Sequence, residues 1–90
     1  MKNDALTVRI LTPEGTLFEG AAEAVFLPGM KGAFEVLPGH APLIAVTVPC
    51  SARYVTHDSD GDPQEHVVKV TAGLLSVDND NVALLASKRD

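Results

Sequence analysis

Residues 27–43 read Leu-Pro-Gly-Met-Lys-Gly-Ala-Phe-Glu-Val-Leu-Pro-Gly-His-Ala-Pro-Leu, and this stretch sets the pattern for the rest of the chain. Two Pro-Gly pairs, at 28–29 and 38–39, bracket a short apolar strand at 33–37. Proline fixes one backbone angle and glycine allows conformations closed to other residues, so the pattern predicts two rigid loops. Such loops can close a small β-fold or present a docking surface, and the residues alone leave both readings open.

Outward from this stretch, the chain alternates with the two-residue period of β-strands. Leu6, Val8 and Ile10 alternate with polar residues, which is typical of a strand with one buried face. The 43–48 segment is rich in branched residues, so we expect a buried strand that ends at Pro49. Other strands are predicted at 16–19, 23–27, 33–37, 51–56, 64–71, 74–77 and 82–85, with turns at 12–15, 58–63 and 78–81.

The predicted fold class is all-β. Eight to ten short strands joined by tight turns indicate a roughly ten-stranded β-sandwich or flattened barrel, and no window carries a good helical stripe. Ninety residues suffice for a single domain with a modest core. We expect the β-sandwich domain to span residues 1–86 and residues 87–90 to form a frayed C-terminal tail.

Composition excludes several classes of function. A formal net charge of −5, without a cluster of Lys and Arg, argues against nucleic-acid binding. One cysteine, Cys50, cannot form an internal disulfide, and no apolar run has the length of a signal peptide or a membrane span. These features indicate a cytoplasmic protein whose membrane association, if any, comes through a partner.

Candidate catalytic and metal-binding residues are few. The three histidines, His40, His57 and His66, lack the spacing of a metal site, and Cys50 at a strand end is better explained as a small buried residue than as a nucleophile. No paired carboxylates or phosphate-binding loop stand out. We therefore expect no catalytic residues, no metal and no cofactor.

The 27–43 segment resembles the N-terminal domain of the F-type ATP synthase epsilon subunit, whose hallmark is similar to LPG-x-x-G-x-F-x-V-LPGHAP-L. The opening residues 11–20 and the closing segments 71–77 and 81–86 are also similar to that family, in the family's order. The resemblance implies a non-catalytic central-stalk subunit that links the gamma subunit to the c-ring and couples proton or sodium transport to ATP synthesis. It implies a peripheral position on the cytoplasmic face of the bacterial inner membrane, attached only through the complex, and no obligate homo-oligomer.

The resemblance also implies which residues meet the two partners. The c-ring contact is expected at Gly29, Met30, Lys31, Gly32 and Ala33, and the gamma contact at Pro38, Gly39, His40, Ala41 and Pro42. Ala33 stands where the family often has an acidic residue, which favours backbone and shape contacts with the ring. We expect His40 to fix the 38–42 turn by hydrogen bonding.

Two further expectations remain. Only four residues follow the predicted domain at 1–86, so we expect neither the inhibition of ATP hydrolysis nor the ATP binding that the family associates with a C-terminal helical hairpin. The alternative function is a stand-alone β-sandwich module that binds protein or carbohydrate. Against the carbohydrate reading, the chain has no Trp and few other aromatic residues.

Overall fold

The computed structural model describes residues 5–29 and 32–89, and all regular secondary structure within these ranges is β-strand. This confirms the predicted all-β class, with a strand number close to the expected ten. The strands are β1 (Leu6–Thr12), β2 (Gly15–Ala22), β3 (Ala24–Gly29), β4 (Gly32–Val36), β5 (Leu43–Thr47), β6 (Cys50–His57), β7 (Pro63–Val70), β8 (Gly73–Asp78) and β9 (Asn81–Leu85).

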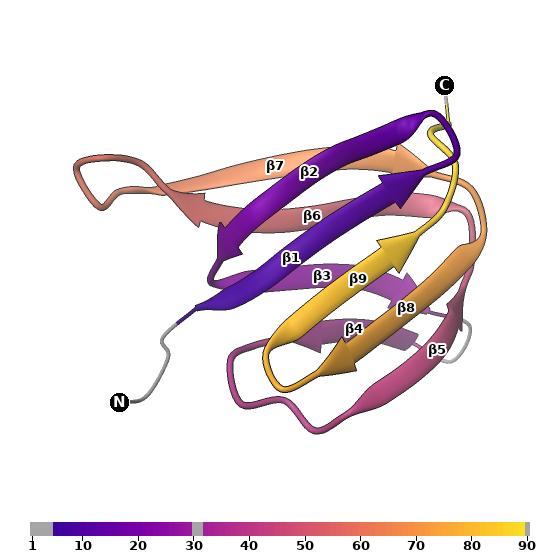
Figure 1. Cartoon of the computed structure of the whole chain (residues 1–90), viewed down its shortest axis with the longest axis horizontal. Helices are drawn as coiled ribbons and strands as arrows, with labels where there is room; N and C mark the ends of the chain where they lie inside the picture. Colours follow the sequence, from indigo (N-terminus) through magenta and orange to yellow (C-terminus); the bar gives the residue numbers. More distant parts are fainter. Residues whose placement is uncertain (1–4, 30–31, 90) are drawn as a thin grey trace.

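The strands form two sheets packed as a sandwich (Figure 1). The five-stranded sheet has the order β2-β1-β9-β8-β5, and the four-stranded sheet has the order β4-β3-β6-β7. The pairing of β1 with β9 is parallel, and the other neighbours are antiparallel. The chain crosses between the sheets at 22–24 and 47–50, among other places, so both sheets need residues from distant parts of the sequence.

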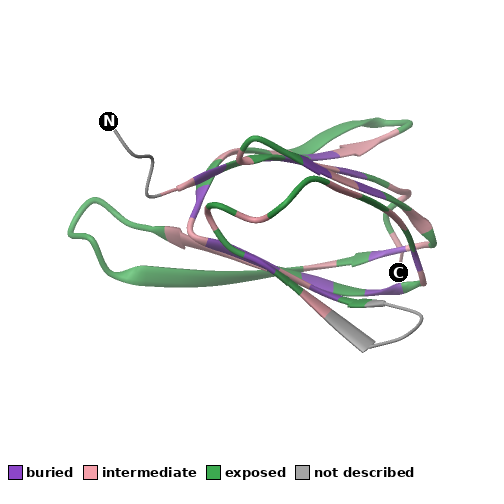
Figure 2. Ribbon diagram, turned by 90° about the horizontal axis from the view of Figure 1, so that it is seen from below, coloured by how far each residue is buried: buried purple, intermediate pink, exposed green. Residues whose placement is uncertain are grey.

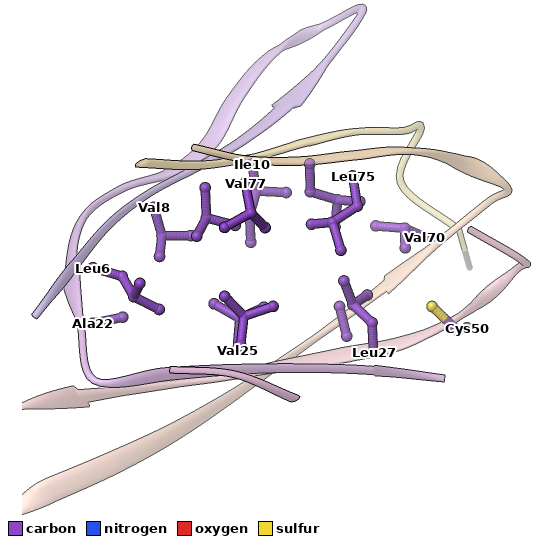
Figure 3. Packing of buried hydrophobic residues seen from close by; sticks show 14 residues of the cluster. Leu6, Val8, Ile10, Ala22, Val25, Leu27, Cys50, Val70, Leu75 and Val77 are labelled. Carbon is purple, nitrogen blue, oxygen red and sulfur yellow. The ribbon is translucent and has the colours of Figure 1, made fainter. Parts of the chain in front are cut away.

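The core lies between the sheets and follows the alternation in the sequence. In β1 the side chains of Leu6, Val8 and Ile10 are almost fully buried, while the intervening residues are exposed. Figure 3 shows these side chains pointing toward those of β3, where Val25 and Leu27 are buried. Each buried aliphatic side chain of this size stabilises the fold by about 1.5–3 kcal/mol, so packing between the two sheets holds the sandwich together.

The predicted turns form at the expected places in the chain. The 12–15 turn joins β1 to β2, and a register shift beside it leaves Leu17 without a partner in β1 as a bulge residue. In the 78–81 turn Asn79 and Asp80 both have positive φ, at 51° and 63°, as a type I′ hairpin requires. The turn at 58–62 carries the β6–β7 hairpin, which projects beyond the sandwich as an exposed arm (Figure 2).

Two expectations about single elements are wrong. The 43–48 segment is not a buried strand: β5 is an edge strand that pairs only with β8, and its alternate side chains face out. Residues 87–89 are not frayed, because Thr71 N–H donates to the Ser87 carbonyl at 2.9 Å and Arg89 N–H donates to the Lys69 carbonyl at 2.8 Å. Asp90 lies outside the described residues.

Candidate docking surfaces

The loop between β4 and β5 contains the residues predicted to meet the gamma subunit. It opens with a tight turn in which His40 N–H donates to the Leu37 carbonyl at 3.1 Å. Pro38 and Gly39 are its central residues, and Gly39 has a φ of 87°. Pro followed by a positive-φ Gly is the type II turn, so the sequence dictates the shape of this loop.

A second element ties this loop down from a distance. The Gly39 N–H donates to the Asp80 carboxylate oxygen Oδ1 at 2.8 Å, across 41 residues of sequence. Asp80 sits in the β8–β9 turn with a positive φ, and its carboxylate reaches the loop. Sequence reasoning missed this contact, because the Asp-Asn-Asp-Asn run at 78–81 indicated only a hairpin turn.

The side chain of His40 makes one hydrogen bond inside the loop, and its predicted role in fixing the 38–42 turn stays a prediction. Its Nδ1 lies 2.7 Å from the Ala41 carbonyl oxygen, so the ring nitrogen donates to the next residue of the loop. The loop and the β8–β9 turn together line a shallow pocket of about 380 Å³. Its lining residues are Gly39, His40, Ala41, Pro42, Asp78, Asn79 and Asp80.

Next to this loop, the outer face of the five-stranded sheet carries an exposed apolar row. Val46 pairs with Leu74, Leu74 with Leu85, and Leu85 with Leu11, so these four side chains cross the sheet from β5 to β1. Val46 is 64% exposed, Leu85 45% and Leu74 39%, and Ile44 beside them is 75% exposed. We call Ile44, Val46, Leu74, Leu85 and Leu11 the apolar row.

The apolar row is continuous with the loop. Pro42 ends the loop and Leu43 begins β5, so Ile44 lies two residues beyond it. A shallow pocket lined by Pro42, Ile44, Ser76 and Asp78, among others, joins the two features. Exposed apolar side chains gathered in this way mark an interaction site on many proteins. In the sequence, the branched residues of 43–48 are the one sign of this apolar surface, but they predict a strand buried inside the fold.

The loop predicted to meet the c-ring lies elsewhere. Gly29 pairs with Gly32 and Pro28 with Ala33 at the ends of β3 and β4, while Met30 and Lys31 lie outside the described residues. The 38–42 loop follows the opposite end of β4, so the structure does not bring the two predicted contact segments together. A five-residue strand separates them by about 17 Å.

The remaining reactive side chains do not converge. His57 Nε2 lies 3.2 Å from Glu23 Oε1, and His66 bonds the Thr56 hydroxyl at 2.9 Å and stacks on Tyr54, whereas His40 is in the loop. Across residues 5–29 and 32–89, no three His, Cys, Asp or Glu side chains come together as metal ligands would. The part of the chain that the structure describes also holds no helix suited to crossing a bilayer.

Cys50 lies at the end of the core. Its side chain is 5% exposed, and burial raises the pKa of its thiol, an effect that the nearby Arg89 charge partly opposes. A thiol with a raised pKa is a poor nucleophile at neutral pH. Its place in the structure is that of a core residue.

Comparison with known proteins gives a consistent result. A family model described as the ATP synthase delta/epsilon chain, beta-sandwich domain, matches residues 5–89. The ATP synthase epsilon chain of Chlorobaculum tepidum is 33% identical over 84 residues, which cover 93% of this chain and 91% of that protein. The epsilon chain of Campylobacter jejuni strain RM1221 is 34% identical over 85 residues, covering 93% of this chain and 62% of that protein.

Solved structures show the same fold. A chain in the Euglena gracilis mitochondrial ATP synthase (OSCP/F1/c-ring) superposes with a TM-score of 0.79 at 13% identity, covering 98% of this chain and 54% of the other. A chain in the central stalk and c-ring of the Tetrahymena thermophila mitochondrial ATP synthase gives 0.76 at 11% identity, covering 98% and 67%. The chain spans 62% of the length of the Campylobacter relative and about half of the Euglena chain.

Proposed function

Because this chain belongs to the ATP synthase delta/epsilon β-sandwich family, we propose that it is a non-catalytic central-stalk subunit of an F-type ATP synthase, seated on the gamma subunit. The observation that carries the proposal is the apolar row beside the 38–42 loop. Since side chains as exposed as Ile44 and Val46 are costly to leave in water, this face is suited to a permanent partner.

The loop and the apolar row have complementary roles in this docking. The row supplies apolar area, and the loop supplies fixed backbone groups at its rim. The loop is held in one shape by its type II turn and by Asp80, so little conformational entropy is lost when a partner binds. The backbone groups of this loop therefore form the polar edge of the gamma contact, which consists of Pro38, Gly39, His40, Ala41 and Pro42.

The second contact is proposed at the opposite end of β4. Gly29, Gly32 and Ala33, together with Met30 and Lys31 outside the described residues, would meet polar loops of the c-ring. Contacts at the two ends of one strand let a rigid sandwich bridge two partners. In this arrangement protons or sodium ions drive rotation of the ring, and the subunit transmits that rotation to gamma. The subunit is peripheral to the cytoplasmic face of a bacterial inner membrane, to which only the rest of the complex attaches it.

Site-specific crosslinking in the assembled enzyme tests this placement. A photoreactive residue at Ile44 is expected to crosslink to gamma, whereas the same residue at Ser51, exposed on the four-stranded sheet, is not. Membranes are solubilised after irradiation, and the products are identified by mass spectrometry. Crosslinks from position 44 only to proteins outside the ATP synthase would overturn the proposal.

A further inference from the structure

A second surface lies on the opposite side of the sandwich from the β5 edge. There the edge strands β2 and β7 run along the same side of the molecule (Figure 1), and an open cleft of about 440 Å³ lies between the two sheets. Its apolar part includes Leu17, the bulge residue of β2, together with Tyr54 and Val68. Its rim carries Lys69, Lys88 and Arg89, and we call the whole feature the basic cleft.

The charge of the basic cleft is opposite to that of the chain. The protein has a formal net charge of −5, yet three cationic side chains gather at this rim. The ion pairs among the described residues, Arg53–Glu65 and His57–Glu23, use none of them. Arg89 is held in place because its Nε donates to the Val70 carbonyl at 3.2 Å.

The cleft also borders an unfilled sheet edge. The Lys69 carbonyl accepts the Arg89 N–H, which shows that it points away from β6. Beside it, Lys88 forms an antiparallel bridge with Val70. Backbone groups in a strand alternate in direction, so the N–H and C=O of Val67 and Glu65 point the same way as those of Lys69. Within the described residues, no strand pairs with them, and Val67 is 57% exposed.

We propose that the basic cleft binds an acidic, extended segment of a partner protein, which adds to β7 as a further strand. Residues 87–89 already form the first rung of such a strand, and the incoming segment would extend it past Val67 toward Glu65. Its carboxylates, on one face of the added strand, would meet Lys69 and Arg89, with the Lys88 charge close by. Its aliphatic side chains, on the other face, would enter the cleft beside Leu17 and Val68. Main-chain bonds would supply affinity and the charges would supply selectivity.

A protein segment fits this surface better than an anionic membrane does. Lipid phosphates could pair with the three cations, but they cannot donate to the outward carbonyls of β7 or follow a strand edge. The apolar part is a cleft between two sheets and not a protruding patch that could enter a bilayer. The proposal does not depend on the docking of gamma at the apolar row, which lies on a different face.

The test uses the ¹⁵N-labelled 90-residue chain and an acetylated, amidated hexapeptide that alternates Glu with Val. NMR titration is expected to shift amides at 65–69 and 88–89, and bound peptide is expected to slow exchange of the Val67 N–H. Lys88→Glu, at an exposed position, should weaken binding by about five- to tenfold at low salt. Val67→Pro removes an outward N–H at an edge position, where proline is tolerated, and should weaken binding more than Val67→Thr does.

Controls on the peptide side keep the test decisive if Val67→Pro fails to fold. A peptide N-methylated at alternate amides cannot pair along an edge and should bind weakly, and a peptide with Lys in place of Glu should not bind. Equal binding of the Lys peptide, or shifts confined to Ile44 and Val46, would overturn the proposal. The proposal would also be overturned if the Glu peptide did not bind while the chain bound phosphatidylglycerol vesicles saturably and Lys88→Glu abolished that vesicle binding.

Discussion

Asp58 organises the turn at the tip of the β6–β7 arm through both oxygens of its carboxylate. Oδ1 accepts the N–H groups of Asp60 and Asp62, both at 2.9 Å, and Oδ2 accepts from the Gln64 amide at 3.2 Å. These bonds favour the charged form, so they lower the pKa of Asp58, with the Asp62 N–H contributing most. A fully exposed acid thus gains a structural role in the turn.

This lowered pKa predicts how the turn responds to acid. An unfolded Asp has a pKa of about 3.9. The stabilisation by Asp58 is therefore complete above that value and is lost as pH falls through its lower folded pKa. NMR titration should place the Asp58 carboxyl below an unperturbed Asp, and the Asp60 and Asp62 amides should shift with it. Asp58→Asn, which keeps the Oδ1 acceptor, should remove this titration and keep the turn. A midpoint at or above the ordinary value would contradict the assignment.

Gly73 is a second residue with a role set by its surroundings. Its N–H donates to the buried Thr47 hydroxyl at 3.1 Å, and a Cβ at this position would collide with the Leu85 carbonyl oxygen and the Ala86 side chain. Gly73→Ala should therefore lower the free energy of unfolding by about 1–3 kcal/mol, measured by urea denaturation. The control is Gly20→Ala, where an added Cβ meets only the movable Phe18 ring. Equal effects of the two substitutions would show that the close approach at Gly73 is unimportant.

At the scale of elements, the Asp80–Gly39 bond links the β8–β9 turn to the β4–β5 loop. Asp80→Gly should keep the type I′ turn, because Asn-Gly is favoured there, while it removes the carboxylate from Gly39. We expect faster hydrogen exchange at the Gly39 N–H, measured by NMR, and weaker binding of gamma. Asp80→Asn retains an oxygen acceptor and should leave exchange nearly unchanged. Exchange that stays slow in Asp80→Gly would show that the loop holds its shape without this bond.

Elements were predictable from the sequence where local chemistry decides them. The alternation of residues 6–10, a tight loop at Pro38-Gly39 and the hairpin turn at 78–81 all appear as expected, because each depends on neighbours in the chain. The position of a strand within a sheet depends on distant residues instead. The branched residues of β5 therefore indicated burial, although the strand lies at an edge with Ile44 and Val46 exposed.

The difference between local and long-range contacts also explains which parts of the docking surfaces the sequence revealed. The two loops were found because each is a continuous motif, and their expected partners stay predictions. The apolar row joins residues from β1, β5, β8 and β9, so only the sheet order reveals it. The basic cleft likewise joins Leu17 to Lys69 and Arg89, residues that no local pattern connects.

For the whole molecule, the sandwich offers distinct surfaces in distinct directions. The 38–42 loop adjoins the apolar row, Gly29 and Gly32 lie at the far end of β4, and the basic cleft opens along the β2 and β7 edges. A small domain buries a limited share of its surface and gains stability from a permanent partner. This arrangement suits the connecting role that we propose for the chain.

The most direct test of this account is the affinity of the chain for its own gamma subunit, measured by calorimetry. Val46→Asp places a charge in the apolar row and should weaken binding by about tenfold or more, whereas Ser51→Asp places the same charge on the other sheet and should bind like the original chain. Circular dichroism of both variants should show an unchanged β spectrum. Undiminished binding by a folded Val46→Asp variant, or no binding of gamma by the original chain, would contradict the account.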